Sequence, residues 1–78
     1  MEYISDRLEQ ILILLGEASQ PLTSAQLAEK VKVSVRTVKK DMSELNAILK
    51  DYDAAILART GVGYQLSVND EFLYNQFL

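Results

Sequence analysis

The chain has no cysteine and no histidine among its 78 residues. Disulfides, thiolate or imidazole catalysis and the commonest zinc sites are therefore excluded. Long apolar runs are missing too. The longest, residues 11–15 (ILILL), is far shorter than the roughly 20 residues that span a bilayer, and no cationic signal sequence precedes it. We expect a cytoplasmic protein that uses no membrane, cofactor, metal or small-molecule ligand.

Positive charge is scarce outside one short segment. The net charge is −3, yet residues 30–40 hold five cations and no acid, a local +5. Residues 1–29 and residues 41–78 each carry −4. The distribution of charge says more about partners than its sum does, so a polyanion is attracted to this one segment. The five cations are Lys30, Lys32, Arg36, Lys39 and Lys40.

The first part of the chain predicts two helices within one small globular domain. Ser5 is the expected N-cap of a helix over residues 6–18. Thr23 starts a capping box and a short helix over residues 24–30. In the first helix an apolar stripe follows the i, i+3, i+4, i+7 spacing of a buried face. Its members are Leu8, Ile11, Leu12 and Leu15.

Ser34 is the expected N-cap of a third helix, over residues 35–50. Only a few residues separate it from the second helix, and two capped helices at that spacing form a helix-turn-helix unit. On a helical wheel of about 100° per residue, five apolar residues of the third helix fall on one face, which we predict to be its core face. They are Val35, Val38, Met42, Leu45 and Leu49.

The opposite face of the third helix carries cations and short side chains. Arg36 and Lys40 lie one turn apart there, and Ser43 and Ala47 continue the same line. The cations also lie near a helix N-terminus, which is itself weakly positive. Such a face can enter a groove about 12 Å wide, which is the width of the DNA major groove.

After the third helix the apolar period changes to two, over residues 54–68. Gly61 and Gly63 permit the positive φ angles of a tight connection, so we predict a β-hairpin with its tip at residues 60–63. The single Gly-Val-Gly is too short for a dinucleotide-binding loop. The inward residues of the hairpin are expected to be Ile56, Ala58, Tyr64, Leu66 and Val68.

Asn69 is the expected N-cap of a last helix. The chain stops while that helix is still apolar, so we expect a longer parent protein. We divide the chain into a domain over residues 1–68 and the start of a connecting helix, residues 69–78, that leads to a downstream domain. The apolar residues of this helix are Phe72, Leu73, Tyr74, Phe77 and Leu78.

The predicted fold is mainly α with a small β-hairpin: a three-helix core plus a wing, followed by the start of a C-terminal helix. Residues 22–46 and 59–68 resemble the N-terminal winged helix-turn-helix module of bacterial regulators linked to the sugar phosphotransferase system, the antiterminator-like activators with PTS-regulation domains. The biotin operon repressor, DeoR-type repressors and Mga-like regulators are similar. The likeness covers residues 7–68 and is strongest at residues 34–38 (SVRTV) and 61–64 (GVGY).

The resemblance implies binding to double-stranded DNA by a regulator of carbohydrate uptake or metabolism genes. A single recognition helix reads too few base pairs to find one site in a genome, so we also expect a homodimer through the parent protein. The wheel adds Lys39, at the rim of the outward face, as an expected phosphate contact, and Ser43 as a small residue on that face. The positions that the resemblance assigns to DNA contact are Ser34, Arg36, Thr37 and Lys40 on the helix, with Arg59 and Thr60 on the wing.

Several of these residues also have a purely structural interpretation. The cations could form a solvated face, and Lys40 could pair with Glu44 one turn later. Thr37, at the third helical position, could bond its own backbone without touching DNA. Asp41 is expected to pair with a cation rather than to face phosphate, and Tyr64 is expected to lie in the core.

Two other functions remain open beside binding of duplex DNA. The first is a winged helix that docks a protein, favoured by the acidic remainder of the chain and by Ile13 and Leu14, which widen the apolar arc of the first helix. The second is RNA binding, although no stacking aromatics interrupt the cations. Asp51 and Asp53 have no catalytic or metal partner set beside them, so we do not expect an enzyme.

Overall fold

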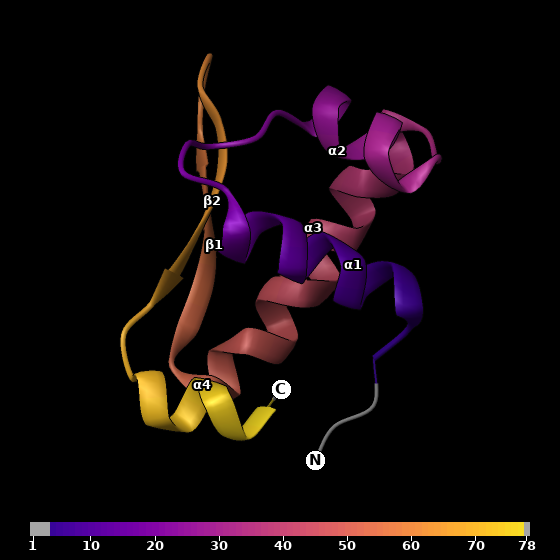
Figure 1. Ribbon diagram of the computed structural model, residues 1–78. Coiled ribbons are helices and arrows are strands. Elements are labelled where there is room, and N and C mark those ends of the chain that lie inside the picture. Colours follow the sequence, from indigo (N-terminus) through magenta and orange to yellow (C-terminus); the bar gives the residue numbers. More distant parts are fainter. Residues whose placement is uncertain (1–3, 78) are drawn as a thin grey trace.

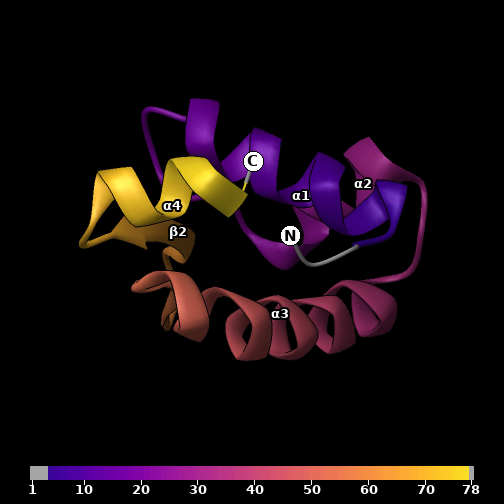
Figure 2. The same ribbon diagram turned by 90° about the horizontal axis from the view of Figure 1, so that it is seen from below.

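The computed structural model describes residues 4–77. Three helices come first, α1 (Asp6–Glu17), α2 (Ser24–Val31) and α3 (Val35–Leu49). Figure 2 shows α3 running along one side of the molecule, with α1 and α4 on the other side. Residues 1–3 of the predicted domain and Leu78 of the predicted last helix lie outside the described range.

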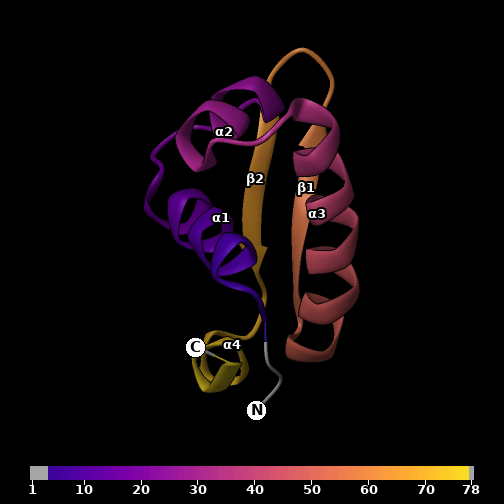
Figure 3. The same cartoon turned by 90° about the vertical axis from the view of Figure 1, so that its right-hand side faces the viewer.

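A 3-10 turn, η1 (Lys50–Tyr52), joins α3 to an antiparallel hairpin of β1 (Ala54–Arg59) and β2 (Gly63–Val68). The last element is α4 (Glu71–Phe77). Figures 1 and 3 show the hairpin tip at one end of the molecule, beside α2 and the start of α3, and α4 at the other end. This order confirms the predicted winged helix-turn-helix fold. None of the described helices is long and apolar enough to cross a membrane.

All three predicted N-caps of the first three helices are confirmed. The Ser5 hydroxyl accepts a hydrogen bond from the Leu8 N–H at 3.3 Å. Thr23 and Gln26 form a complete capping box, with bonds of 2.9 and 3.1 Å. Ser34 caps α3. Each cap satisfies N–H groups that a helix leaves without partners, which fixes where the three helices start.

The turn between α2 and α3 depends on a left-handed residue. Lys32 adopts φ 60° and ψ 48°. Its N–H and that of Val33 both donate to the carbonyl of Ala28. This arrangement closes the C-terminus of α2 and turns the chain into α3 within three residues. The segment of cations from Lys30 onward is thereby split between the end of α2 and the start of α3.

The core lies between the first three helices and the base of the hairpin. The predicted stripe of α1 and most of the predicted face of α3 are buried. Val35 is an exception, at 38% exposure, and the prediction that it belongs to the core was wrong. A wheel gives the direction of a side chain but not its position along the helix. The first residue of α3 lies beyond the covered part, whereas Val38, three residues later, is fully buried. The buried apolar residues are Leu8, Ile11, Leu12, Leu15, Leu27, Ala28, Val38, Met42, Leu45, Leu49, Ala54, Ile56 and Tyr74.

The hairpin pairs Ala54 with Val68 at its base and Arg59 with Gly63 at its tip. Ile56 is buried as predicted, but Ala58 is exposed, so its predicted inward position was wrong. The inward face of the strand continues past the end of the helices, and from this point the hairpin is a projecting wing (Figure 1).

Tyr64 docks the wing on the rest of the domain. Its N–H donates to the Leu22 carbonyl at 2.7 Å, and its carbonyl accepts from the Leu22 N–H at 2.9 Å. The side chain is half-buried and packs against the core, as predicted. The backbones of Gly63 and Leu22 lie so close together that a Cβ on Gly63 would come within 2.7 Å of the Leu22 carbonyl. Gly63, at φ 132°, therefore fixes where the wing leaves the domain.

The last helix starts one residue later than predicted. The side chain of Asp70, not Asn69, accepts from the Leu73 N–H at 3.1 Å, and the Asp70 carbonyl accepts from the Tyr74 N–H. Asn69 instead closes the base of the hairpin, because its N–H and side-chain amide both donate to oxygens of Asp53. The Asn69 prediction was therefore wrong. Tyr74 is buried, so α4 contributes to the core.

Candidate nucleic-acid interface

One end of the molecule brings together the start of α2, the start of α3 and the wing tip (Figures 1 and 3). The start of α3 and the wing tip carry the residues for which the sequence predicts DNA contact, except Ser43, which lies in the middle of α3. The first turns of α3 have their direction set by the buried residues Val38 and Met42, which pack on the opposite face of the helix. The outward face of α3 is therefore held rigidly toward solvent.

On that face, Arg36, Lys40, Ser43 and Ala47 are all exposed. Within the described range of the chain, the one salt bridge joins other residues, and the alternative pairing of Lys40 with Glu44 is absent. The guanidinium of Arg36 and the ammonium of Lys40 thus point away from the core with their hydrogen-bond donors available. Charged donors of this kind bind phosphate oxygens and the acceptor edges of bases.

Ser34 and Thr37 form a hydroxyl pair at the N-terminus of α3. The Ser34 Oγ accepts from the Thr37 N–H at 3.1 Å and lies 3.0 Å from the Thr37 Oγ1. The local partner of the Thr37 side chain is thus the Ser34 hydroxyl and not the backbone. The pair has two hydroxyl protons, and the bond between the two oxygens uses one of them. One O–H is thus left to donate outward, from whichever of the two residues accepts in the mutual bond.

A groove of about 450 Å³ separates α3 from the wing. Lys39 lines it from the helix, and Arg59 and Thr60 line it from the hairpin. The structure therefore joins three predicted site residues that lie about 20 positions apart in the sequence. Thr23 and Ser24, at the start of α2, also line this groove. From the sequence Thr23 is recognisable only as a cap, because the contact between Leu22 and β2 is what brings it to the wing.

Asp41 is an acid in the middle of the basic helix, and the structure shows how its charge is balanced. It is 3% exposed, and the Arg7 guanidinium on α1 donates to both of its oxygens, at 2.7 and 3.1 Å. These hydrogen bonds, and the attraction of the carboxylate, raise the pKa of Arg7 above its ordinary value. The predicted structural pairing of Asp41 is confirmed. The ion pair joins α1 to α3 and keeps a negative charge off the outward face.

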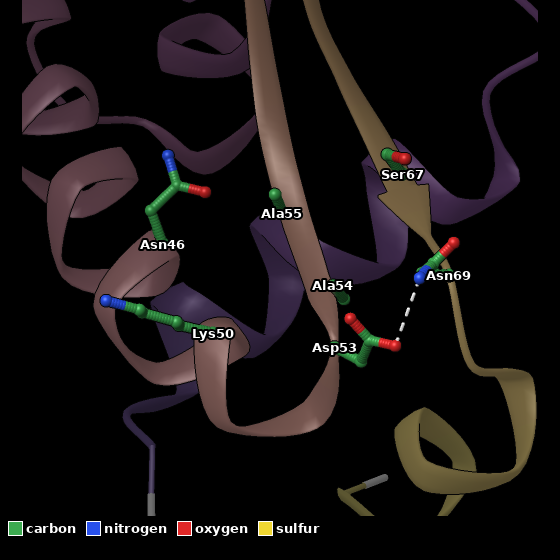
Figure 4. A pocket seen from close by; sticks show the side chains of 7 residues that line it. All are labelled: Asn46, Lys50, Asp53, Ala54, Ala55, Ser67 and Asn69. Atoms are coloured by element: carbon green, nitrogen blue, oxygen red, sulfur yellow. Dashed lines mark hydrogen bonds between the residues drawn. The ribbon is translucent and has the colours of Figure 1, made fainter.

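A second hollow, of about 460 Å³, lies near the base of the hairpin beside the last turn of α3. Figure 4 shows Asn46 and Lys50 on its helix side and the bond from Asn69 to Asp53 on its other side. Asn46 binds the edge of β1, accepting from the Ile56 N–H at 2.6 Å and donating to its carbonyl at 3.2 Å. This hollow has one cation, Lys50, and lies away from the wing tip.

Comparison with known proteins agrees with the winged helix-turn-helix fold. The family described as HTH domain matches residues 7–65 of the chain. A probable licABCH operon regulator of Bacillus subtilis (strain 168) is 38% identical over 72 residues, which are 92% of this chain and 11% of that protein. The chain thus spans about a tenth of that relative's length. The crystal structure of ScpB from Mycobacterium tuberculosis has a TM-score of 0.68 at 21% identity, over 99% of this chain and 49% of that one, which supports the fold.

Proposed function

Because this chain belongs to the HTH domain family, we propose that it is the sequence-specific, duplex-DNA-binding module of a bacterial transcription regulator. Its similarity to a licABCH operon regulator supports the regulatory role. Its resemblance to regulators linked to the sugar phosphotransferase system points to genes of carbohydrate uptake or metabolism. The role is binding and not catalysis, and it is exercised in the cytoplasm, where the chromosome lies.

The observation that carries the proposal is the cationic face of α3 at the same end as the wing. Arg36 and Lys40 project from that face without ion-pair partners among the residues the structure describes. Placing α3 in the major groove brings these side chains to the base edges and the wing to the adjacent backbone. The groove between α3 and the wing is then occupied by a sugar-phosphate strand, with Lys39 on one side and Arg59 and Thr60 on the other.

The individual residues take different roles in this placement. Arg36, the second residue of α3, reads a base through two hydrogen bonds to guanine. Lys39 and Arg59 bind phosphates and carry no sequence information. Ser34 and Thr37 together give one hydroxyl donor to the backbone, and Ser43 lets the helix approach closely.

One module reads too few base pairs to find a single site in a genome, so the parent protein is proposed to act as a homodimer. The identified relative is much longer than this chain, which leaves room for a dimerisation domain elsewhere in the parent. Spacing between two half-sites then supplies the remaining specificity.

Salt dependence of binding to random duplex DNA tests the proposal. Contact with about four to six phosphates predicts a slope of log affinity against log salt of about −4 to −5. Lys39→Ala should make the slope shallower by about one unit, and Arg36→Ala should also flatten the preference among operator variants. Lys50→Ala is the matched control, because Lys50 is an exposed lysine at the other end of α3 and should leave the slope unchanged. A flat salt dependence for the unmodified chain would contradict the proposal.

A second candidate is docking of a protein partner. A groove of about 340 Å³ between α1 and α2 is lined by Ile13, Leu14 and Val31, and Ile13 is 45% exposed. Ile13→Asp separates the two functions. It should leave DNA binding intact if α3 is the interface, and it should abolish binding to a protein partner that uses the groove.

A further inference from the structure

Val35 is an apolar residue that the fold does not use. It is the first residue of α3, 38% exposed, and it is not among the side chains packed against the core. Valine also has a lower helix propensity than alanine because its branched Cβ restricts its rotamers. Neither packing nor helix formation therefore accounts for a valine at this position.

The position of Val35 on α3 relates it to the proposed interface. On a wheel of about 100° per residue, Val35 begins an arc of about 140° that ends at Lys40. Its neighbour one turn later is Lys39, which lines the groove beside the wing. Val35 thus lies at the N-terminal tip of α3, at the edge between the core face and the face that carries the cations. The other members of the arc are Arg36, Lys39, Ser43, Asn46 and Ala47, and like Val35 they are exposed.

Val35 is the one large apolar side chain on this arc. The major groove presents donors and acceptors on every base, but its characteristic apolar group is the 5-methyl of thymine. A recognition helix contacts base edges mainly through its N-terminal residues, and Val35 is the first of them. A charged side chain cannot make this contact favourably, whereas a branched aliphatic side chain can.

We propose that Val35 is a specificity-determining residue that contacts the 5-methyl group of a thymine beside the base read by Arg36. This inference rests on the proposed DNA-binding function and adds a base position to it. Removing one methyl group from a buried apolar contact lowers affinity about fourfold. Loss of the thymine methyl should therefore weaken binding by about that factor, at one position only.

The test starts with selection of duplexes from a random-sequence library by the 78-residue chain. In the selected duplex, each thymine is replaced in turn by deoxyuridine, which removes the methyl group and keeps all hydrogen-bonding groups. Dissociation constants are measured at fixed salt for the unmodified chain and for Val35→Ala. We expect one deoxyuridine substitution to weaken the unmodified chain about fourfold and to leave Val35→Ala unaffected, the non-additivity that marks a direct contact.

Two further variants sharpen the result. Val35→Thr keeps the branched shape and one methyl group, so it should retain part of the response to deoxyuridine. Ile13→Ala removes an equally exposed aliphatic residue on α1, away from the proposed interface, and should respond like the unmodified chain. Circular dichroism and thermal unfolding of Val35→Ala should match those of the unmodified chain, because the side chain is outside the core.

The possible outcomes distinguish failure of the thymine contact from failure of the proposed DNA binding. If every deoxyuridine substitution is neutral while Arg36→Ala still changes the ranking of duplexes, Val35 does not read a thymine and the DNA-binding proposal stands. An equal response to deoxyuridine in the unmodified chain and in Val35→Ala overturns the inference in the same way. If no duplex is enriched by the selection, sequence-specific binding itself fails, and the role of Val35 fails with it.

Discussion

Alanine at Gly63 should release the wing from the helical domain, whereas alanine at Gly61 should not. At Gly63, φ is 132°, and an added Cβ would lie 2.7 Å from both the carbonyl carbon and oxygen of Leu22 and 3.0 Å from the Thr23 nitrogen. These are backbone atoms within paired or capped segments, so they cannot move aside as a flexible side chain would. Gly61 also has a positive φ, 78°, but no atom lies within 4 Å of its added Cβ.

The two substitutions therefore differ mainly in the backbone clash. A positive φ costs a non-glycine residue about 1–3 kcal/mol. Overpacking against fixed atoms adds about 1–3 kcal/mol to this cost. Alanine also lowers the conformational entropy of the unfolded chain, which offsets about 0.4–1 kcal/mol of the cost. Gly63→Ala should lose roughly 2–5 kcal/mol of the about 4–12 kcal/mol expected for a domain of this size. Gly61→Ala avoids the clash and should lose about 1 kcal/mol.

Thermal unfolding followed by circular dichroism measures the difference. At about 6 °C per kcal/mol, Gly63→Ala should lower Tm by more than about 10 °C and Gly61→Ala by less than about 10 °C. Because Gly63→Ala also displaces Arg59 and Thr60 from the groove beside Lys39, it should weaken DNA binding at temperatures where it remains folded. Equal Tm values for the two variants would show that the close approach of Leu22 does not hold the wing.

Three other substitutions test single features of the fold. Ser34→Ala removes the cap of α3 and should cost about 1 kcal/mol in urea unfolding, a loss that Ser34→Asn should largely restore. Asn46→Ala leaves the N–H and carbonyl of buried Ile56 without their side-chain partner and should cost about 1–3 kcal/mol; an unchanged urea midpoint would refute this. Burial, with a smaller effect of the Glu71 carboxylate, raises the pKa of Tyr74 above 10.0, so folding favours its neutral form. Stability should then be full below pH 10 and fall as pH rises through the folded pKa, with a shallower fall in Tyr74→Phe.

Local signals in the sequence predicted most of the fold. Three N-caps, a capping box and a change of apolar period from 3.6 to 2 each depend on residues close together in the chain. Such features are readable without knowing the tertiary structure. The errors at Val35 and Ala58 share one cause. Both lie in correctly predicted elements at a correctly predicted angle, but beyond the point where those elements are covered by others. Periodicity predicts which way a side chain points, but it does not predict where along a helix or strand the covering elements end.

Contacts between distant segments were less predictable. The sequence predicted that Asp41 needs a cation, but not that the cation is Arg7, 34 residues away. It predicted a cap near the start of α4, but the choice between Asn69 and Asp70 depends on Asp53, which binds Asn69 at the base of the hairpin. In the site, the cations of α3 follow from the wheel alone. The groove that joins Lys39 to Arg59 does not, because it requires the docking of the wing at Leu22.

If the chain binds DNA as proposed, its uneven charge determines the orientation in which it approaches the duplex. Residues 30–40 carry a net +5, and the segments before and after carry −4 each. At physiological salt, charges influence one another over about 8 Å, so DNA is attracted to the cationic end and repelled elsewhere. The acids therefore lower the overall affinity while they favour the orientation in which α3 enters the groove. A module of low affinity binds firmly only when a second module is held at the right spacing, because linkage raises the effective concentration of the second contact. On this reasoning, a change in the spacing or the linkage of two modules is expected to change DNA binding more than a change within one module.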